Sequence, residues 1–183
     1  RQMLRDVFVG TTAERTIRSV RCPILMVNAP PTAHYRHVLQ TTDLSDGSRD
    51  ALQRFSALGL AARARRSLLY VFGAPALRLV MGHTMPREDR EHYLADAKGE
   101  AAEELSRFAA AAGLGDVRRI LREEAAATAH EILEAAAEEE ADLIVLSTHG
   151  RSGLSKVLIG SVAEQVLRTA QVDVLAVPPD AAP

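Results

Sequence analysis

The stretch LIVLSTHGRSGLSKVLIGS, residues 143–161, is the part of the sequence most informative about the fold. Its first four residues form an unbroken apolar run, which is typical of a strand covered on both faces of a parallel sheet. Glycines interrupt the residues that follow, and a helical spacing of apolar residues then runs from about Ser161 to Ala170. The stretch therefore predicts a strand, a glycine-containing loop and a helix in succession.

The same alternation of strand and helix patterns occurs through most of the chain. Short apolar runs predict strands, and apolar residues repeated every three or four positions predict the helices between them. This alternation predicts an open parallel five-stranded sheet with helices on both faces, which binds ligands outside the carboxyl ends of its strands. The predicted strands are 38–41, 67–72, 117–121, 143–146 and 174–177, and the predicted helices centre on 51–62, 94–112, 129–137 and 161–170.

The two ends of the chain resemble each other. Residues 1–27 align without a gap on residues 151–177, with nine identities that include a glycine, an Ala-Glu pair and two arginines. Identities in register over such a length indicate a duplicated unit. We therefore expect a helix-strand remnant of a preceding module in residues 1–30, a linker in residues 31–35, and a complete module in residues 36–180.

Two kinds of structure fit the glycine-containing loop. Backbone N–H groups in a glycine turn, together with the first N–H groups of the next helix, can bind a phosphate. Gly150 and Gly153 would form that turn, with Arg151 adding positive charge, and Ser161 would cap the helix and offer its hydroxyl. The alternative is an ordinary turn and an ordinary cap, since the stretch is neither a Walker A loop nor the three-glycine dinucleotide pattern. These residues alone leave both interpretations open.

Three segments resemble the universal stress protein family. Nucleotide-binding members carry Gly-x2-Gly-x9-Gly-Ser/Thr after the fourth strand, and this sequence has Ser147-x2-Gly150-x9-Gly160-Ser161. The segment HVLQTTDLSDGSRDAL is similar to the family's opening strand and Asp-x-Ser turn, and ADLIVLSTHGRSGL is similar to its fourth strand and loop. The resemblance runs from about residue 36 to residue 178 and implies a Rossmann-like fold, in a tandem arrangement with a truncated first module.

The resemblance also implies a site for ATP, with or without Mg²⁺. By position, Asp43 would contact the adenine or ribose with Thr41 and Thr42 nearby, and the backbone of Val71 would contact the base. The phosphates and their surroundings would involve Ser147, His149, Gly150, Arg151, Gly153, Gly160, Ser161 and Val162.

Two departures from the family pattern favour a second class of function. Ser147 replaces the first glycine of the motif, and Ala126-Ala127-Thr128 stands where the family often has Gly-x-Pro before a helix. The alternative to an ATP-binding regulatory module is therefore a stress protein that binds no nucleotide and acts as a dimerisation or chaperone-like interaction module.

The resemblance implies a binding module and not a dedicated enzyme, with slow ATP hydrolysis compatible with it. No carboxylate pair suited to Mg²⁺ is close to the glycine loop in the sequence. His149 is expected to contact ligand or solvent, and His34 with His37 lacks the further ligands of a metal site. We therefore predict neither catalytic nor metal-binding residues.

Composition and the last strand lead to expectations about partners. The 183 residues carry a formal net charge of −2 and contain no apolar run of membrane-spanning length, so we expect a cytoplasmic protein without nucleic acid or membrane as partner. In the family, the last strand often pairs with the same strand of a second copy. We expect either such a homodimer or a pairing of Ile24–Val27 with Val174–Val177 inside one chain.

Overall fold

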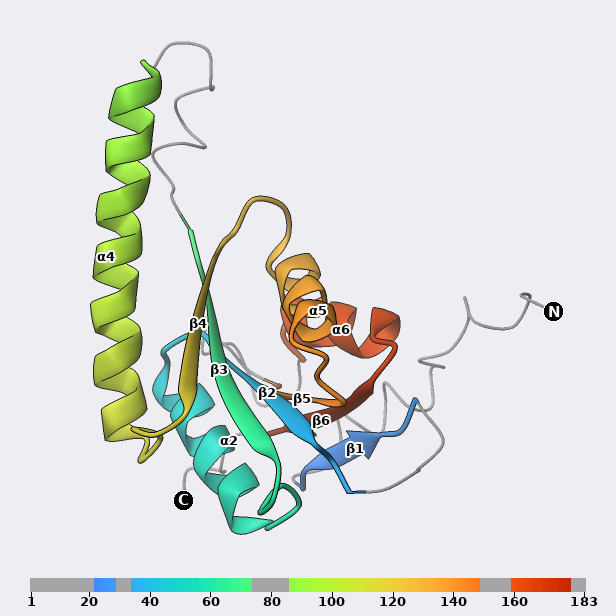
Figure 1. Ribbon diagram of the computed structural model, residues 1–183. Helices are drawn as coiled ribbons and strands as arrows, with labels where there is room; N and C mark the ends of the chain where they lie inside the picture. Colours follow the sequence, from blue (N-terminus) through green and yellow to red (C-terminus); the bar gives the residue numbers. More distant parts are fainter. Residues whose placement is uncertain (1–21, 29–33, 74–85, 149–158, 179–183) are drawn as a thin grey trace, which may run out of the picture.

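The computed structural model describes residues 22–28, 34–73, 86–148 and 159–178, and these residues form one sheet covered by helices (Figure 1). None of the described helices has the length and apolar character that crossing a membrane requires. The described strands are β1 (Ile24–Met26), β2 (His37–Thr42), β3 (Arg65–Phe72), β4 (Arg118–Glu123), β5 (Leu143–Ser147) and β6 (Asp173–Val177), and the described helices are α2 (Asp46–Ala57), α4 (Arg87–Ala111), α5 (Thr128–Glu138) and α6 (Ser161–Thr169).

Five of these strands form the parallel sheet that the sequence predicts. The order across the sheet is β1-β6-β5-β2-β3-β4, and every neighbouring pair from β6 to β4 is parallel. The sixth strand, β1, joins the edge in the antiparallel direction, with Leu25 opposite Leu175. This is the pairing inside one chain that was one of the two arrangements expected for the last strand. The helix predicted ahead of β1 lies outside the described residues, so the duplicated module remains a prediction.

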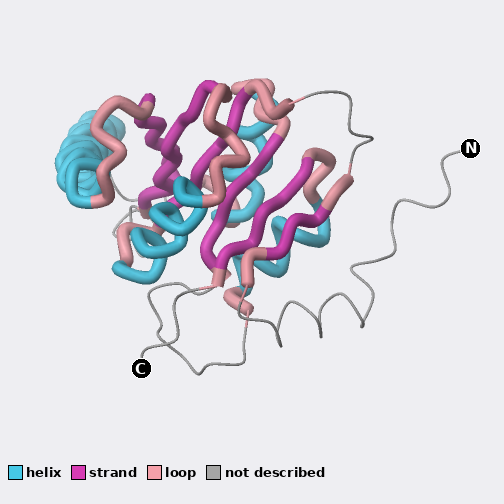
Figure 2. Tube along the Cα trace, turned by 90° about the horizontal axis from the view of Figure 1, so that it is seen from below, coloured by secondary structure: helices cyan, strands magenta, loops and turns pink. Residues whose placement is uncertain are grey.

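The helices cover both faces of the sheet, α2 and α4 on one and α5 and α6 on the other (Figure 2). Strand β5 shows why its sequence is an unbroken apolar run. Leu143 and Val145 belong to the core under α2 and α4, whereas Ile144 and Leu146 belong to the core under α5 and α6. Because successive side chains of a strand point to opposite faces, a strand buried on both sides needs apolar residues at every position.

The ends of the helices follow local chemistry. The Ser45 side chain caps α2, since its oxygen accepts a hydrogen bond from Ser48 N at 3.1 Å. Past the end of α4, Gly113 has a φ of 72°, the left-handed conformation that favours glycine after a helix. This helix begins at Arg87, ahead of the predicted start at residue 94. The sequence pattern does not indicate the first turns, because they are exposed on all sides and have no apolar face.

Asp173, the first residue of β6, holds both ends of the connection between β1 and β2. Its Oδ1 accepts a hydrogen bond from Asn28 N at 2.8 Å, and its Oδ2 accepts one from the Tyr35 hydroxyl at 2.7 Å. Burial raises the pKa of Tyr35, and the hydrogen bond to Asp173 raises it further. The Asn28 side chain also donates to the carbonyl oxygens of Ala170 and Val172, at 3.3 and 2.9 Å. The β1 segment and the start of the module are thus tied to one carboxylate.

Candidate functional site

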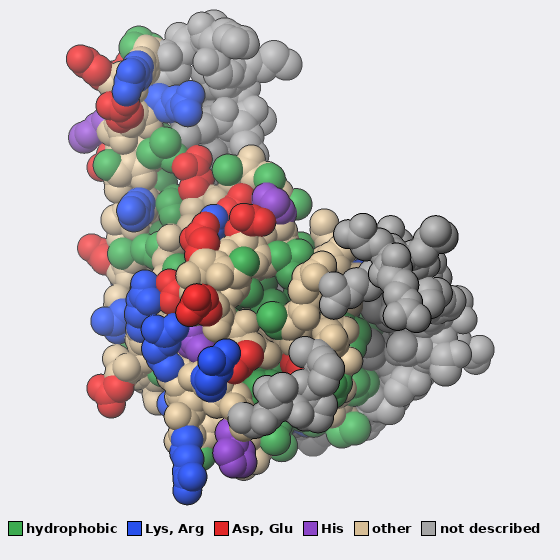
Figure 3. Space-filling view, turned by 45° about the vertical axis from the view of Figure 1, so that its right-hand side comes forward, with side chains coloured by type: hydrophobic (Ala, Val, Ile, Leu, Met, Phe, Trp, Pro, Cys, Tyr) green, Lys and Arg blue, Asp and Glu red, His purple; other side chains and the backbone are tan. Residues whose placement is uncertain are grey.

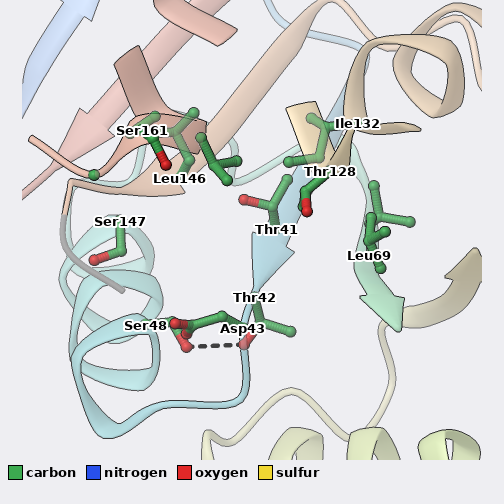
Figure 4. Close-up of a pocket in the computed structure, with 14 residues that line it drawn as sticks. Thr41, Thr42, Asp43, Ser48, Leu69, Thr128, Ile132, Leu146, Ser147 and Ser161 are labelled. Atoms are coloured by element: carbon green, nitrogen blue, oxygen red, sulfur yellow. Dashed lines mark hydrogen bonds between the residues drawn. The ribbon is translucent and has the colours of Figure 1, made fainter. Parts of the chain in front are cut away.

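A pocket lies at the carboxyl ends of β2, β3 and β5 (Figure 4). The chain builds outward from β2 to β3 and β4 on one side and returns to place β5 and β6 on the other, so this edge is the switch point where open parallel sheets bind ligands. The cavity has a volume of about 360 Å³. It is lined by Thr41, Thr42, Asp43, Ser48, Leu69, Val71, Thr128, Ile132, Leu146, Ser147, Gly160, Ser161, Val162 and Ala163.

The predicted site residues fall into two groups. The first group is described and lies entirely in the lining of this pocket: Thr41, Thr42, Asp43, Val71, Ser147, Gly160, Ser161 and Val162. The second group lies outside the described residues and comprises His149, Gly150, Arg151 and Gly153. The fold therefore brings the first loop of the module together with the start of α6, while contact of any of these residues with a ligand remains a prediction.

The end of β2 is fixed by hydrogen bonds between side chains and backbone. Thr42 Oγ1 accepts a hydrogen bond from Leu44 N at 2.9 Å and lies 2.8 Å from Ser48 Oγ, the contact drawn as a dashed line in Figure 4. Ser48 Oγ donates its own proton to Ser45 O at 2.9 Å, so Thr42 is the donor to Ser48. Leu44 has a φ of 66°, a conformation that is uncommon for a residue with a side chain. The turn is therefore held in one shape.

Asp43 is the acidic residue of the pocket lining. Its Oδ1 accepts hydrogen bonds from Ser45 N at 3.1 Å and from Ser45 Oγ at 2.6 Å. These bonds orient the carboxylate, and no hydrogen bond from the described residues reaches its Oδ2. Asp43 thus offers the pocket an acceptor oxygen in a fixed position.

The start of α6 corrects one prediction about Ser161. The N-cap is Gly160, in an extended conformation with φ −61° and ψ 146°, and Ser161 is the first residue of the helix instead of its cap. Gly160 N donates to Thr148 O at 2.8 Å, and the first bond inside the helix runs from Glu164 N to Gly160 O at 2.9 Å. The N–H groups of Ser161 and Val162 precede that bond and have no acceptor within the helix. They form its positive end, next to the pocket.

Part of the lining consists of residues that the sequence motifs do not include. Thr128, the first residue of α5, lies in the pocket, and its hydroxyl donates a hydrogen bond to a carboxylate oxygen of Glu124. The sequence could have indicated Thr128 as a site residue, because it begins a helix that follows a strand ending at the same edge of the sheet. The other lining residues that were not predicted for the site are Ser48, Leu69, Ile132, Leu146 and Ala163.

The start of α5 is braced by buried charge. Glu131 is 7% exposed, and its carboxylate accepts hydrogen bonds from Arg122 Nε at 3.2 Å and from Ala126 N at 3.3 Å. Arg122 also donates to Glu138 at 2.6 Å. Burial lowers the pKa of Arg122, but the hydrogen bonds to Glu138 and Glu131 outweigh it and raise the pKa above its ordinary value. These bonds hold the loop that leads to Thr128. On the face of the molecule drawn in Figure 3, acidic and basic side chains are interspersed.

His37, one of the two histidines considered as metal ligands, is hydrogen-bonded inside the described part of the fold. His37 is buried, and its ring nitrogens lie 2.7 Å from Glu139 O and 2.9 Å from Ser67 Oγ. Among the residues that the structure describes, no group of three or more His, Cys, Asp and Glu side chains is placed to hold a metal ion.

Comparison with known sequences identifies a family. Residues 34–178 match the model of the universal stress protein family. The chain is 28% identical over 144 residues to universal stress protein A homolog 1 of Coxiella burnetii, which covers 79% of this chain and 96% of that protein. It is 26% identical over 171 residues to the universal stress protein E homolog of Haemophilus influenzae, covering 89% of this chain and 54% of that relative. The chain thus spans about half the length of the second relative.

Solved structures agree with the family match. A protein of unknown function from Pseudomonas aeruginosa has a TM-score of 0.68 and 23% identity, over 97% of this chain and 59% of its own, and this likeness is one of fold alone. A universal stress protein in complex with cAMP has a TM-score of 0.51 and 26% identity, over 81% of this chain and all of its own. Because the family match spans most of the sequence and the fold is shared, the chain belongs to the universal stress protein family.

Proposed function

We propose that this chain is a nucleotide-binding universal stress protein module whose pocket takes ATP and whose role is regulation of a stress response. One observation carries the proposal. Asp43 follows β2, and Gly160 and Ser161 lie at the start of α6, far away in the sequence. These residues nevertheless line the same cavity at the switch point of the sheet. Nucleotides bind at that position in open parallel sheets.

The start of α6 suits the phosphates. The N–H groups of Ser161 and Val162 precede the first hydrogen bond of the helix, and the helix dipole adds positive potential at the same place. The Ser161 side chain does not cap the helix, and it lines the pocket (Figure 4). Its hydroxyl therefore supplies a further donor for a phosphate oxygen. Mg²⁺, when bound with ATP, would neutralise part of the phosphate charge.

The opposite side of the pocket suits the nucleoside. Leu69, Val71 and Ile132 form an apolar surface of the kind that covers a flat aromatic base. Asp43 Oδ2 is an acceptor for a ribose hydroxyl, which is a donor. The backbone of Val71, at the end of β3, is the proposed contact for the polar edge of the base.

A relative adds support for this choice of ligand. The universal stress protein solved with cAMP shares this fold, and cAMP is an adenine nucleotide. The proposal concerns binding, and it assigns no residue to hydrolysis of ATP.

The test is isothermal titration of the chain with ATP, alongside Gly160→Asp and Gly160→Ala. A Cβ at residue 160 would lie 3.5 Å from Thr148 O, an ordinary contact, so the alanine side chain fits and the aspartate adds a carboxylate to that same Cβ. Aspartate is also a favourable N-cap, so α6 should be at least as stable in the Gly160→Asp variant as in the Gly160→Ala variant. The aspartate carboxylate would lie beside the phosphates of ATP. We therefore expect the Gly160→Asp variant to bind ATP at least about tenfold more weakly than the Gly160→Ala variant.

Equal binding by the two variants would show that the start of α6 does not hold phosphate. No binding to the unsubstituted chain at millimolar ATP would reject the proposed function. It would then favour the alternative, an interaction module that acts through a strand edge such as β1, where Leu25 is exposed.

A further inference from the structure

The hydroxyl proton of Thr128 is already used inside the protein. Thr128 Oγ1 donates to a carboxylate oxygen of Glu124, and an ionised carboxylate only accepts. Because a hydroxyl has one hydrogen, Thr128 has only its lone pairs left for a ligand in the pocket. Thr128 is a partly exposed residue of the pocket lining, so a ligand can reach it.

The neighbouring polar side chains, like Thr128, can only accept hydrogen bonds from a ligand in the pocket. Thr41 Oγ1 donates its proton to Val145 O at 3.2 Å, and a carbonyl oxygen cannot return it. Asp43 contributes a carboxylate. The polar side chains from the end of β2 and the start of α5 are therefore acceptors toward the pocket, whereas the N–H groups at the start of α6 are donors.

The position of Thr128 indicates which part of a ligand it would meet. In Figure 4 it lies beside Ile132 and between Thr41 and Leu69, on the apolar side of the pocket, whereas Ser161 lies on the other side. A nucleotide with its phosphates at Ser161 would therefore place its base near Thr128.

We propose that Thr128, with its proton held by Glu124, selects a base that carries a hydrogen-bond donor, as the exocyclic amine of adenine does. A base without a donor at that place leaves the lone pairs of Thr128 unpaired. A hydrogen bond to a carboxylate is among the stronger ones, so Thr128 gives up its bond to Glu124 less readily than a neutral bond. This inference rests on the proposed function, because it concerns the specificity of the same pocket.

The experiment compares two ligands that differ only in the amine, ATP and purine riboside 5′-triphosphate, by titration calorimetry. The unsubstituted chain should bind the amine-free ligand about tenfold more weakly, the effect of one hydrogen bond. In Thr128→Val, which keeps the shape and removes the acceptor, the two dissociation constants should agree within about twofold. Thr128→Ser keeps the hydroxyl and should retain the preference for ATP.

Thr169→Val is the matched control, since Thr169 is an exposed threonine of α6 whose hydroxyl donates to Gln165 O. It should bind both ligands as the unsubstituted chain does. An equal affinity of the unsubstituted chain for both ligands, or an unchanged preference in Thr128→Val, would overturn the role of Thr128 while leaving nucleotide binding intact. If neither ligand binds the unsubstituted chain, the proposed function fails, and this inference fails with it.

Discussion

At the scale of single residues, Gln40 on β2 is the buried side chain, among those the structure describes, whose polar atoms have no hydrogen-bond partner. It is fully buried, and neither its amide nitrogen nor its amide oxygen has a hydrogen-bond partner among the described residues. Burying an unpaired polar group costs about 1–3 kcal/mol. We therefore expect Gln40→Leu to raise the free energy of unfolding, measured by urea denaturation, by about 1–2 kcal/mol. Gln165→Leu, at an exposed position of α6, should change it by less than about 0.5 kcal/mol. A less stable Gln40→Leu protein would contradict this account of the core.

The hydrogen bond from Tyr35 to Asp173 makes stability depend on alkaline pH. Burial and Asp173 raise the pKa of Tyr35, so the folded chain retains this proton at a pH where the unfolded chain has lost it. The contribution of protonated Tyr35 to the free energy of unfolding is complete below the ordinary tyrosine pKa of about 10. It decreases as the pH rises through and above that value. Tyr35→Phe should be less stable than the unsubstituted chain by about 1 kcal/mol at pH 8. The difference between their free energies of unfolding should shrink by pH 11. A difference that stays constant between these two pH values would refute the contribution of Tyr35 ionisation.

At the scale of elements, β1 covers the edge of β6. An uncovered edge exposes a row of unpaired N–H and C=O groups that can pair with another chain. Removal of residues 1–28 deletes β1 and should cause concentration-dependent self-association, which sedimentation velocity would detect. Removal of residues 1–21 alone keeps β1 and the Asn28 hydrogen bonds, and it should leave the assembly state of the full chain unchanged. Equal behaviour of the two truncated proteins would show that β1 does not protect the edge.

The sequence predicts elements well where burial leaves a periodic pattern. The apolar run of β5 and the helical spacing of α5 both follow from packing against the sheet, and both elements lie within two residues of the predicted bounds. The first turns of α4 have no such pattern, because they contact little besides solvent. The cap of α6 was assigned to Ser161 because serine is a common cap, but the backbone places Gly160 there.

At the scale of the whole molecule, the parallel sheet and the edge that carries the pocket could be predicted, since alternating strands and helices place all carboxyl ends together. That Asp43 and Gly160 meet in one cavity follows from this topology. The apolar side of the pocket could not be predicted, because Leu69 and Ile132 fit the pattern of any core residue. The acceptor character of Thr128 also depends on Glu124, whose position is set by the tertiary fold.

The proposed pocket holds a nucleotide with its phosphates at the start of α6 and its base on the apolar side. A crystal structure of the chain grown with saturating ATP would show whether it does. We expect electron density for phosphate oxygens within hydrogen-bond distance of Ser161 N and Val162 N, and for the base against Leu69 and Ile132. An empty pocket at saturating ATP, or a nucleotide bound elsewhere on the molecule, would contradict the claim.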